Sequence, residues 1–366
     1  MNPSSSLRPT PSEPPTSEER APTKNLTRKI LTGVLVGVVV YGVIVVIGGT
    51  HEIGRQLRSF TWGAFAAACG LSLLNYALRF AKWEYYLAVL GIRGIAKWES
   101  LLIYLSGFVL TVTPGKVGEV FKSYVLHKRH AVPVVRTAPI VVAERITDLI
   151  GVIVIISLGS ISFPGGALWA TLGALAVGLL LLLVASRRLS DRLFRALTLL
   201  PGPLGKTAAR IGPKVAIALH SLRGLTAPTR LIWPTLLSII AWGLEGIGLW
   251  VILRGFAERP PLTLTAFFYA TATLAGALVP VPGGLGVTDK LLEEQMARLG
   301  GVPSATATAA MLLIRFATLW FAVAVGFAAL GALRMRHPGL LAGAEAPASP
   351  TPSADGDADP GPVDGR

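Results

Sequence analysis

Long stretches without a charged residue constrain this chain more than any other feature. Residues 30–49 form a run of 20 uncharged residues, residues 60–78 a run of 19 and residues 149–186 a run of 38. A run of 18 or more apolar residues can cross the hydrocarbon core of a membrane as a helix, and the longest run suffices for two crossings. Only 15% of the chain is charged, whereas soluble domains average about 25%. The sequence therefore predicts an all-α polytopic membrane protein.

The basic residues lie between the apolar runs. The net charge of +14 is consequently not gathered on one folded polar face, which excludes a typical nucleic-acid reader. Residues 186–230 hold nine Lys or Arg against one acidic residue, so the positive-inside rule predicts a cytoplasmic segment that meets an anionic lipid surface. The second span is expected to end near Leu78, which leaves Arg79 and Lys82 in a basic cytoplasmic connection.

Two Pro-Gly segments interrupt apolar runs at matching places. The stretch TVTPGKVGEVFKSY begins at Thr111 and LVPVPGGLGVTDK begins at Leu278; aligning Pro114 with Pro282 superimposes them at a separation of 168 positions. The apolar run 100–113 before the first break spans about 21 Å as a helix, which is short of the roughly 30 Å hydrocarbon core. Each segment is therefore expected to form the tip of a re-entrant helical hairpin.

Charge placement then predicts six full spans and two hairpins arranged as an inverted repeat. The expected domain covers residues 28–336, with halves of about 28–162 and 163–336 inserted in opposite orientations. The first hairpin would enter from the cytoplasm and the second from outside. Residues 1–27 and 337–366 are expected to be disordered tails, with both termini cytoplasmic.

Charged residues also occur inside the predicted spans. Glu144 and Asp148 share one helical face beside Arg145, while Arg315 lies at nearly the same distance from the second proline as Arg145 does from the first. Two arginines beneath two hairpin tips would bind phosphate oxygens. The alternative is a structural network, in which Arg145 pairs with Asp148 or Glu119 and Arg315 pairs with Glu245.

Other roles for these residues stay open. Glu119 and Asp289 either coordinate an ion, couple transport to a proton, or compensate the charge of a nearby basic residue. The glycines either line a polar cavity or permit close helix packing. The candidate substrate-binding residues are Pro114, Gly115, Lys116, Gly118, Glu119, Lys122, Glu144, Arg145, Asp148, Pro282, Gly283, Gly284, Gly286, Asp289 and Arg315. The chain has no Walker loop, HExxH or GxSxG motif, so no catalytic residue, metal site or cofactor is expected.

Four stretches carry a family resemblance. TPGKVGEVFKSYVLHKR, AERITDLIGV, PVPGGLGVTD and LLIRFATLWF resemble the flippase-like transmembrane region of lysylphosphatidylglycerol synthases. The resemblance covers residues 28–336 and implies a bacterial inner-membrane protein with inverted repeats and re-entrant helices. It does not extend to the soluble aminoacyl-transfer domain, so synthesis of an aminoacylated lipid is not expected.

The resemblance and the site residues favour a flippase or transporter for an anionic or aminoacylated phospholipid or a lipid-linked headgroup. A membrane-embedded enzyme of lipid or glycolipid modification, with Glu119, Glu144 or Asp148 as general base, is the first alternative. An accessory scaffold for lipid-pathway enzymes is the second. A second copy of the chain remains an open partner.

Overall fold

The computed structural model describes residues 50–112, 119–161, 224–279 and 281–338, with isolated residues between 168 and 178. All regular elements within these ranges are helical. Several predictions lie outside them: the span at 30–49, the second crossing within 149–186, most of the basic segment 186–230 and nearly all of both tails. The predicted count of six spans therefore stays a prediction.

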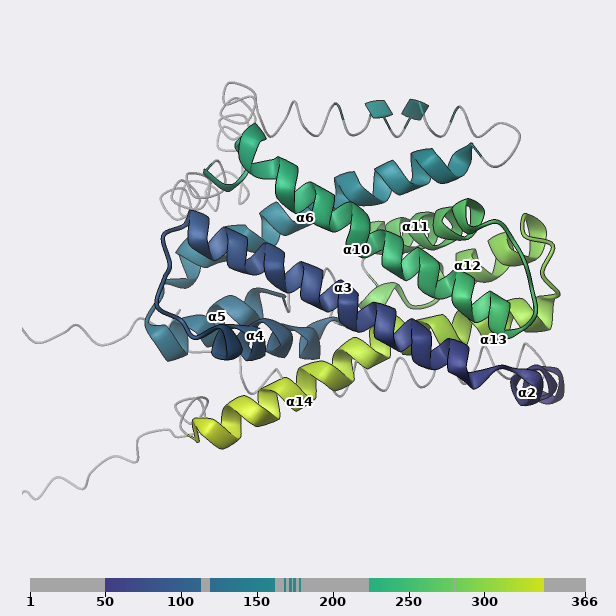
Figure 1. Ribbon diagram of the computed structural model, residues 1–366, viewed down its shortest axis with the longest axis horizontal. Coiled ribbons are helices and arrows are strands. Elements are labelled where there is room, and N and C mark those ends of the chain that lie inside the picture. Colours follow the sequence, from purple (N-terminus) through teal and green to yellow (C-terminus); the bar gives the residue numbers. More distant parts are fainter. Residues whose placement is uncertain are drawn as a thin grey trace, which may run out of the picture.

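Long helices run along the molecule (Figure 1). They are α3 (Trp62–Val89), α6 (Val134–Ser160), α10 (Pro228–Gly255) and a continuous helical segment, residues 304–336. Three of these, α3, α10 and the segment 304–336, are long and apolar enough to cross a membrane. The fourth, α6, has a similar length but carries three charged residues near its middle. The chain is thus a multi-pass membrane protein.

The segment 304–336 contains a change in helix type. It consists of α13 (Ser304–Arg315), a π-helical stretch (Phe316–Trp320) and α14 (Phe321–Arg336). Short π-helical stretches inside α-helices occur frequently at functional sites. Here the hydroxyl of Tyr76 on α3 donates a hydrogen bond of 3.0 Å to the carbonyl of Thr318 within this stretch.

Two pairs of shorter helices flank the two Pro-Gly segments of the sequence. Hairpin 1 (residues 97–130) consists of α4 (Lys97–Ser106), a 3-10 turn (Gly107–Leu110) and α5 (Val120–His130). Hairpin 2 (residues 262–298) consists of α11 (Leu262–Leu278), a 3-10 turn (Pro282–Gly284) and α12 (Val287–Arg298). In each hairpin the two helices pack against each other.

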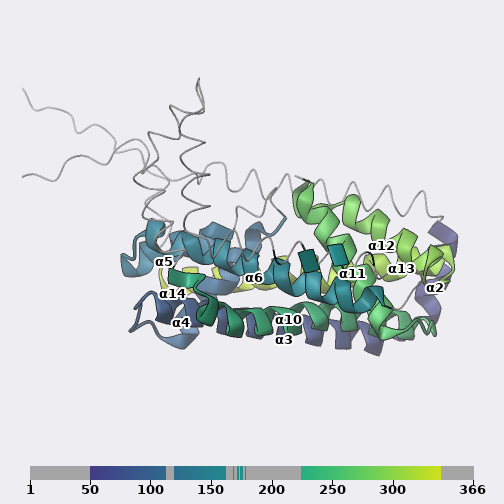
Figure 2. The ribbon, with the colours of Figure 1, turned by 90° about the horizontal axis from the view of Figure 1, so that it is seen from above.

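Hairpin 1 and hairpin 2 lie at opposite ends of the molecule. Figures 1 and 2 both show α4 and α5 at one end of the long axis and α11 and α12 at the other. Helices α3 and α10 pack side by side between these ends, and the amide of Thr61 donates to the carbonyl of Gly255, so the start of α3 meets the end of α10. Near hairpin 2, the amphipathic helix α2 (Thr50–Ser59) lies across the long axis and packs on α13.

Glycine permits the sharp break in hairpin 2. Gly283 and Gly284 have φ angles of +60° and +69°, a region that side-chain-bearing residues rarely adopt. A Cβ atom on Gly284 would also lie 2.6 Å from the hydroxyl oxygen of Thr288. This backbone therefore depends on glycine.

The second span is longer than the sequence predicts. Helix α3 continues to Val89, so Arg79 and Lys82 lie inside it rather than in a cytoplasmic connection. Lys82 is only 1% exposed. Its charge faces the protein interior, where a carboxylate from α6 compensates it, and this is why the helix continues past the end of its apolar run.

Candidate functional site

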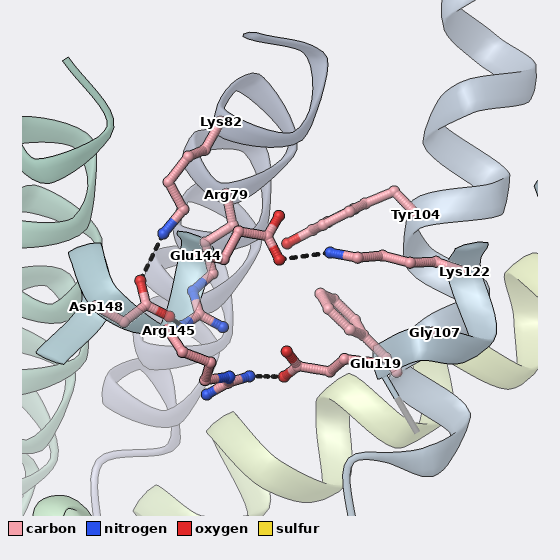
Figure 3. Close-up of a pocket in the computed structure, with 10 residues that line it drawn as sticks. Arg79, Lys82, Tyr104, Gly107, Glu119, Lys122, Glu144, Arg145 and Asp148 are labelled. Carbon is pink, nitrogen blue, oxygen red and sulfur yellow. Dashed lines mark hydrogen bonds and ion pairs between the residues drawn. The ribbon is translucent and has the colours of Figure 1, made fainter. Parts of the chain in front are cut away.

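Charged side chains from α3, hairpin 1 and α6 surround a small cavity, here called the hairpin-1 cavity (Figure 3). Its volume is about 20 Å³, enough for about one water molecule. The lining residues are Arg79, Lys82, Tyr104, Gly107, Phe108, Glu119, Lys122, Glu144, Arg145 and Asp148. Four of these are basic and three are acidic.

Asp148 is the centre of the first ion-pair group. The ammonium of Lys82 donates to Asp148 Oδ1 at 2.5 Å and to the hydroxyl of Ser238 at 2.8 Å. The same hydroxyl donates to Asp148 Oδ1 at 2.9 Å, and Arg79 pairs with the other carboxylate oxygen. Three helices, α3, α6 and α10, are joined through this one carboxylate.

Lys122 on α5 forms the second group. Its ammonium donates to Glu144 Oε2 at 2.6 Å and lies 4.7 Å from the ring centroid of Trp83 and 5.0 Å from that of Tyr104. Lys122 is 3% exposed and Glu144 is 6% exposed. A buried ammonium is stabilised by a carboxylate and by the faces of aromatic rings, and this site supplies both.

Two further ion pairs have the same spacing along the chain, one at each hairpin. Glu119, which immediately precedes α5, pairs with Arg145, and Asp289, in the first turn of α12, pairs with Arg315. The two residues of each pair are separated by 26 positions, and each member of the second pair lies 170 positions after its counterpart in the first. Each pair joins the second helix of a hairpin to the following long helix.

Arg315 holds the break of hairpin 2 in place. Its guanidinium lies 2.8 Å from Asp289 Oδ1 and donates a hydrogen bond of 2.7 Å to the carbonyl of Gly283. Asp289 in turn accepts a hydrogen bond of 2.8 Å from the amide of Gly286. The arginine therefore binds both the tip and the start of α12.

A larger cavity, here called the central cavity, lies between hairpin 1 and the break of hairpin 2. Its volume is about 100 Å³. A Cβ atom on Gly283 would lie 3.7 Å from the Cα atom of Val112, so the break of hairpin 2 lies close to the last described residue of the first arm of hairpin 1. The lining residues are Asn75, Tyr76, Arg79, Phe108, Thr111, Glu119, Trp242, Glu245, Tyr269, Thr273, Gly276, Ala277, Gly283, Gly284, Thr288, Arg315, Thr318, Leu319 and Ala322. Three of them, Arg79, Phe108 and Glu119, also line the hairpin-1 cavity, so the two cavities adjoin.

Glu245 is the acidic residue that α10 adds to the central cavity. Its Oε2 atom accepts a hydrogen bond of 2.5 Å from the hydroxyl of Tyr269 on α11. This contact joins α10 to hairpin 2. Within the described ranges, no group of three or more His, Cys, Asp or Glu residues could hold a metal ion.

The structure brings together most of the predicted site residues that it describes. Glu119, Lys122, Glu144, Arg145 and Asp148 line the hairpin-1 cavity, and Gly283, Gly284 and Arg315 line the central cavity. Pro282, Gly286 and Asp289 belong to the same break, and Asp289 is buried behind it. Pro114, Gly115, Lys116 and Gly118 lie outside the described residues.

Sequence reasoning missed several residues of the site. It assigned Arg79 and Lys82 to a loop, although their spacing of three places them on one helical face, as with Arg145 and Asp148. Nothing in the sequence marks Trp242 and Thr273 as site residues, because each resembles an ordinary residue of an apolar span. The sequence left Asp148 and Glu119 open as partners of Arg145, and the structure shows an ion pair with Glu119. For Arg315 the expected partner was Glu245, and the structure shows an ion pair with Asp289.

Comparison with known proteins matches most of the chain to membrane proteins. The family model described as the lysylphosphatidylglycerol synthase TM region matches residues 31–326, more than half of the 366-residue chain. A UPF0104 membrane protein of Methanothermobacter thermautotrophicus is 25% identical, over an alignment that covers 81% of this chain and 93% of that protein.

Proposed function

The chain belongs to the lysylphosphatidylglycerol synthase TM region family, and from this premise we propose that it binds a polar lipid headgroup and moves it across the membrane. The headgroup passes through the hairpin-1 and central cavities, while the acyl chains remain in the bilayer. The substrate class is an anionic or aminoacylated phospholipid or a lipid-linked headgroup, and the protein acts as a transporter.

The observation that carries this proposal is the concentration of charge between membrane helices. Five basic and five acidic side chains gather at the two cavities: Arg79, Lys82, Lys122, Arg145 and Arg315 with Glu119, Glu144, Asp148, Glu245 and Asp289. Each such charge costs at least about 2.5 kcal/mol at the centre of a membrane helix. A purely structural core would avoid this cost with apolar residues, so the charges indicate a pathway for a polar group.

The broken helices support the same function. Unpaired backbone groups are tolerated at membrane depth only where protein buries them or where they line a polar cavity. Gly283 and Gly284 line the central cavity, and Thr111 reaches it from hairpin 1. Two hairpins at opposite ends that approach each other at Gly283 and Val112 are the arrangement expected of an inverted repeat around a midplane site (Figure 2).

Ion pairs allow a headgroup to bind to the arginines of the pathway and to leave again. Arg145 and Arg315 are each neutralised by a carboxylate, and a phosphate oxygen can replace that carboxylate because guanidinium binds both groups in the same geometry. When the phosphate leaves, the ion pair forms again. No guanidinium then remains buried without a counter-charge.

The orientation follows from the charges at the ends of the helices. At the end of the molecule that carries hairpin 1, the connections and helix ends hold Arg93, Lys97, Lys128, Arg129, Arg136, Arg334 and Arg336. Basic connections favour the cytoplasm. Hairpin 1 is therefore proposed to enter from the cytoplasmic face of the inner membrane and hairpin 2 from the opposite face.

Reconstitution tests this function. Purified protein in vesicles should accelerate the transbilayer exchange of at least one acyl-labelled lipid from a panel of anionic, zwitterionic and aminoacylated phospholipids. Protein-free vesicles and vesicles with heat-inactivated protein serve as controls. An exchange rate equal to that of the controls for every lipid would contradict a transporter.

A lipid inventory distinguishes transport from chemistry. In a strain that lacks the protein, a transporter leaves every lipid species present but changes the leaflet distribution. A missing modified lipid would instead support the enzyme alternative, with a carboxylate such as Glu144 as the base.

A further inference from the structure

Four buried polar atoms of residues that line the central cavity have no hydrogen-bond partner in the described part of the chain. They are Asn75 Oδ1, Arg79 Nε, Trp242 Nε1 and Thr273 Oγ1. All four residues line the central cavity. Asn75 is 1% exposed and Trp242 is 7% exposed, so bulk water does not reach these atoms. Buried polar groups normally have hydrogen-bond partners, so four unpartnered polar atoms on residues around one cavity indicate that a ligand binds there.

Three of these four atoms belong to donor groups, and these three define the occupant; the fourth, Asn75 Oδ1, only accepts and is not a partner for an acceptor oxygen. The guanidinium N–H of Arg79 and the indole N–H of Trp242 can only donate, and the hydroxyl of Thr273 donates readily. Arg79 also lies over Trp242, with Cζ 5.2 Å from the ring centroid, so these two donors come from one corner of the cavity. Arg315 adds a second guanidinium to the wall. A group rich in acceptor oxygens would satisfy these donors together.

We infer that the central cavity is a binding site for the phosphoryl oxygens of a phosphodiester, with Arg79, Trp242 and Thr273 as donors. This inference deepens the proposed function, on which it rests, because it states which of the two cavities holds the phosphate of the headgroup. It also adds Trp242 and Thr273 to the site, two residues that carry no charge and belong to neither hairpin tip.

The hairpin-1 cavity is a poorer site for the phosphate. Its volume of about 20 Å³ is too small for a phosphoryl group, whereas the central cavity offers about 100 Å³. Every charged side chain that lines the hairpin-1 cavity also has an ion-pair partner within the protein. A phosphate there would have to displace those partners. Arg79 and Arg315 of the central cavity are ion-paired as well, but that cavity also offers Trp242 Nε1 and Thr273 Oγ1, which have no partner in the described part of the chain.

The wall of the central cavity further selects the charge of the ligand. Glu119 and Glu245 line it beside Arg79 and Arg315, so the formal charges of its lining side chains balance. The carboxylates oppose a second negative charge on the ligand. A phosphomonoester carries a charge of about −1.5 to −2 at pH 7, whereas a phosphodiester carries one. The site therefore favours the phosphodiester of a phospholipid over free phosphate.

Titration calorimetry on the full-length protein in detergent tests the site. The probes are dihexanoylphosphatidylglycerol, dihexanoylglycerol, which lacks the phosphate, and inorganic phosphate. The phospholipid should bind, and dihexanoylglycerol should bind at least about tenfold more weakly, because it forms no hydrogen bond to a charged acceptor. If inorganic phosphate binds as tightly as the phospholipid, the cavity binds phosphoryl oxygens, but the inferred preference for a phosphodiester is wrong.

Substitutions with matched controls connect binding to the proposed donors. Thr273→Val keeps the shape of the side chain but removes the hydroxyl, and it should weaken phospholipid binding about tenfold, while Thr273→Ser should bind within about twofold of the unchanged protein. Trp242→Phe should weaken binding similarly. Trp233→Phe, on the exposed face of the same helix, should have no effect.

The outcomes separate this inference from the proposed function. If vesicles show lipid exchange but Thr273→Val and Trp242→Phe bind the phospholipid as tightly as the unchanged protein, the phosphoryl site is wrong and transport stands. Binding of dihexanoylglycerol equal to that of the phospholipid would also overturn the site. If no lipid is exchanged but binding depends on Thr273, the protein holds a phospholipid without moving it.

Discussion

At the scale of single residues, Lys82 shows how a charge is kept inside a membrane protein. Its ammonium contacts the carboxylate of Asp148 and the hydroxyls of Ser238 and Thr147, so all three of its hydrogens have acceptors. Desolvating an ammonium is costly, and this cost is offset only when such partners are in place. The same requirement explains why Asp148 has Arg79 as a second basic partner.

Replacing Lys82 should therefore destabilise the protein strongly. Lys82→Met leaves Asp148 with one basic partner fewer and should lower the free energy of unfolding by about 3 kcal/mol. Lys97→Met is the matched control: Lys97 pairs with Glu84, but its side chain is 78% exposed, so the loss should stay below about 1 kcal/mol. Chemical denaturation in detergent measures both. Equal effects of the two substitutions would contradict the structural role of the buried ammonium.

At the scale of elements, helix α14 packs closely on hairpin 1 through a glycine. A Cβ atom on Gly326 would lie 2.6 Å from the backbone nitrogen of Val109 and 2.9 Å from the carbonyl carbon of Phe108. Since backbone atoms cannot rotate away as a side chain can, this contact fixes the distance between α14 and the 3-10 turn of hairpin 1. Phe108, which lies in this 3-10 turn, lines both cavities.

A methyl group at this contact should separate the two elements. Gly326→Ala is expected to cost about 1–3 kcal/mol through overpacking and to slow lipid exchange, because it shifts hairpin 1 relative to the central cavity. Gly331→Ala provides a control on the same helix, since nothing lies within 4 Å of its Cβ position. It should be neutral or slightly stabilising, because alanine favours helix more than glycine does. Thermal stability and exchange rates of the two variants would test this, and indistinguishable variants would refute the close contact.

The sequence predicts the elements better than the contacts between them. The Pro-Gly breaks were visible because Pro282 and Gly283 interrupt an otherwise apolar run, and the structure breaks the helix there. The extent of α3 was not visible, because the partner that neutralises Lys82 lies 66 positions away, on α6. The 26-residue spacing shared by Glu119–Arg145 and Asp289–Arg315 is present in the sequence. This spacing indicates two matching ion pairs only once the structure shows that both pairs form.

At the scale of the whole molecule, the two hairpins lie at opposite ends, and this predicts opposite exposure across the membrane. Cys69 is the only cysteine in the sequence, so Cys69→Ser gives a background for single labels. In intact cells, a membrane-impermeant maleimide should label Arg298→Cys at the base of hairpin 2. It should label Trp98→Cys, at the base of hairpin 1, only after lysis. Both positions are solvent-exposed in the structure. Labelling of both in intact cells would contradict opposite insertion.

The central claim is that a lipid headgroup crosses through the charged cavities, and the initial rate of lipid exchange in vesicles tests it most directly. Arg145→Glu places a second carboxylate beside that of Glu119 and should reduce the rate to that of protein-free vesicles. The charge-swapped variant Glu119→Arg with Arg145→Glu restores the pair and should recover part of the rate. Arg55→Glu, whose wild-type side chain is 74% exposed on α2, controls for charge reversal and should leave the rate unchanged. An unchanged rate in correctly folded Arg145→Glu would contradict the proposed pathway.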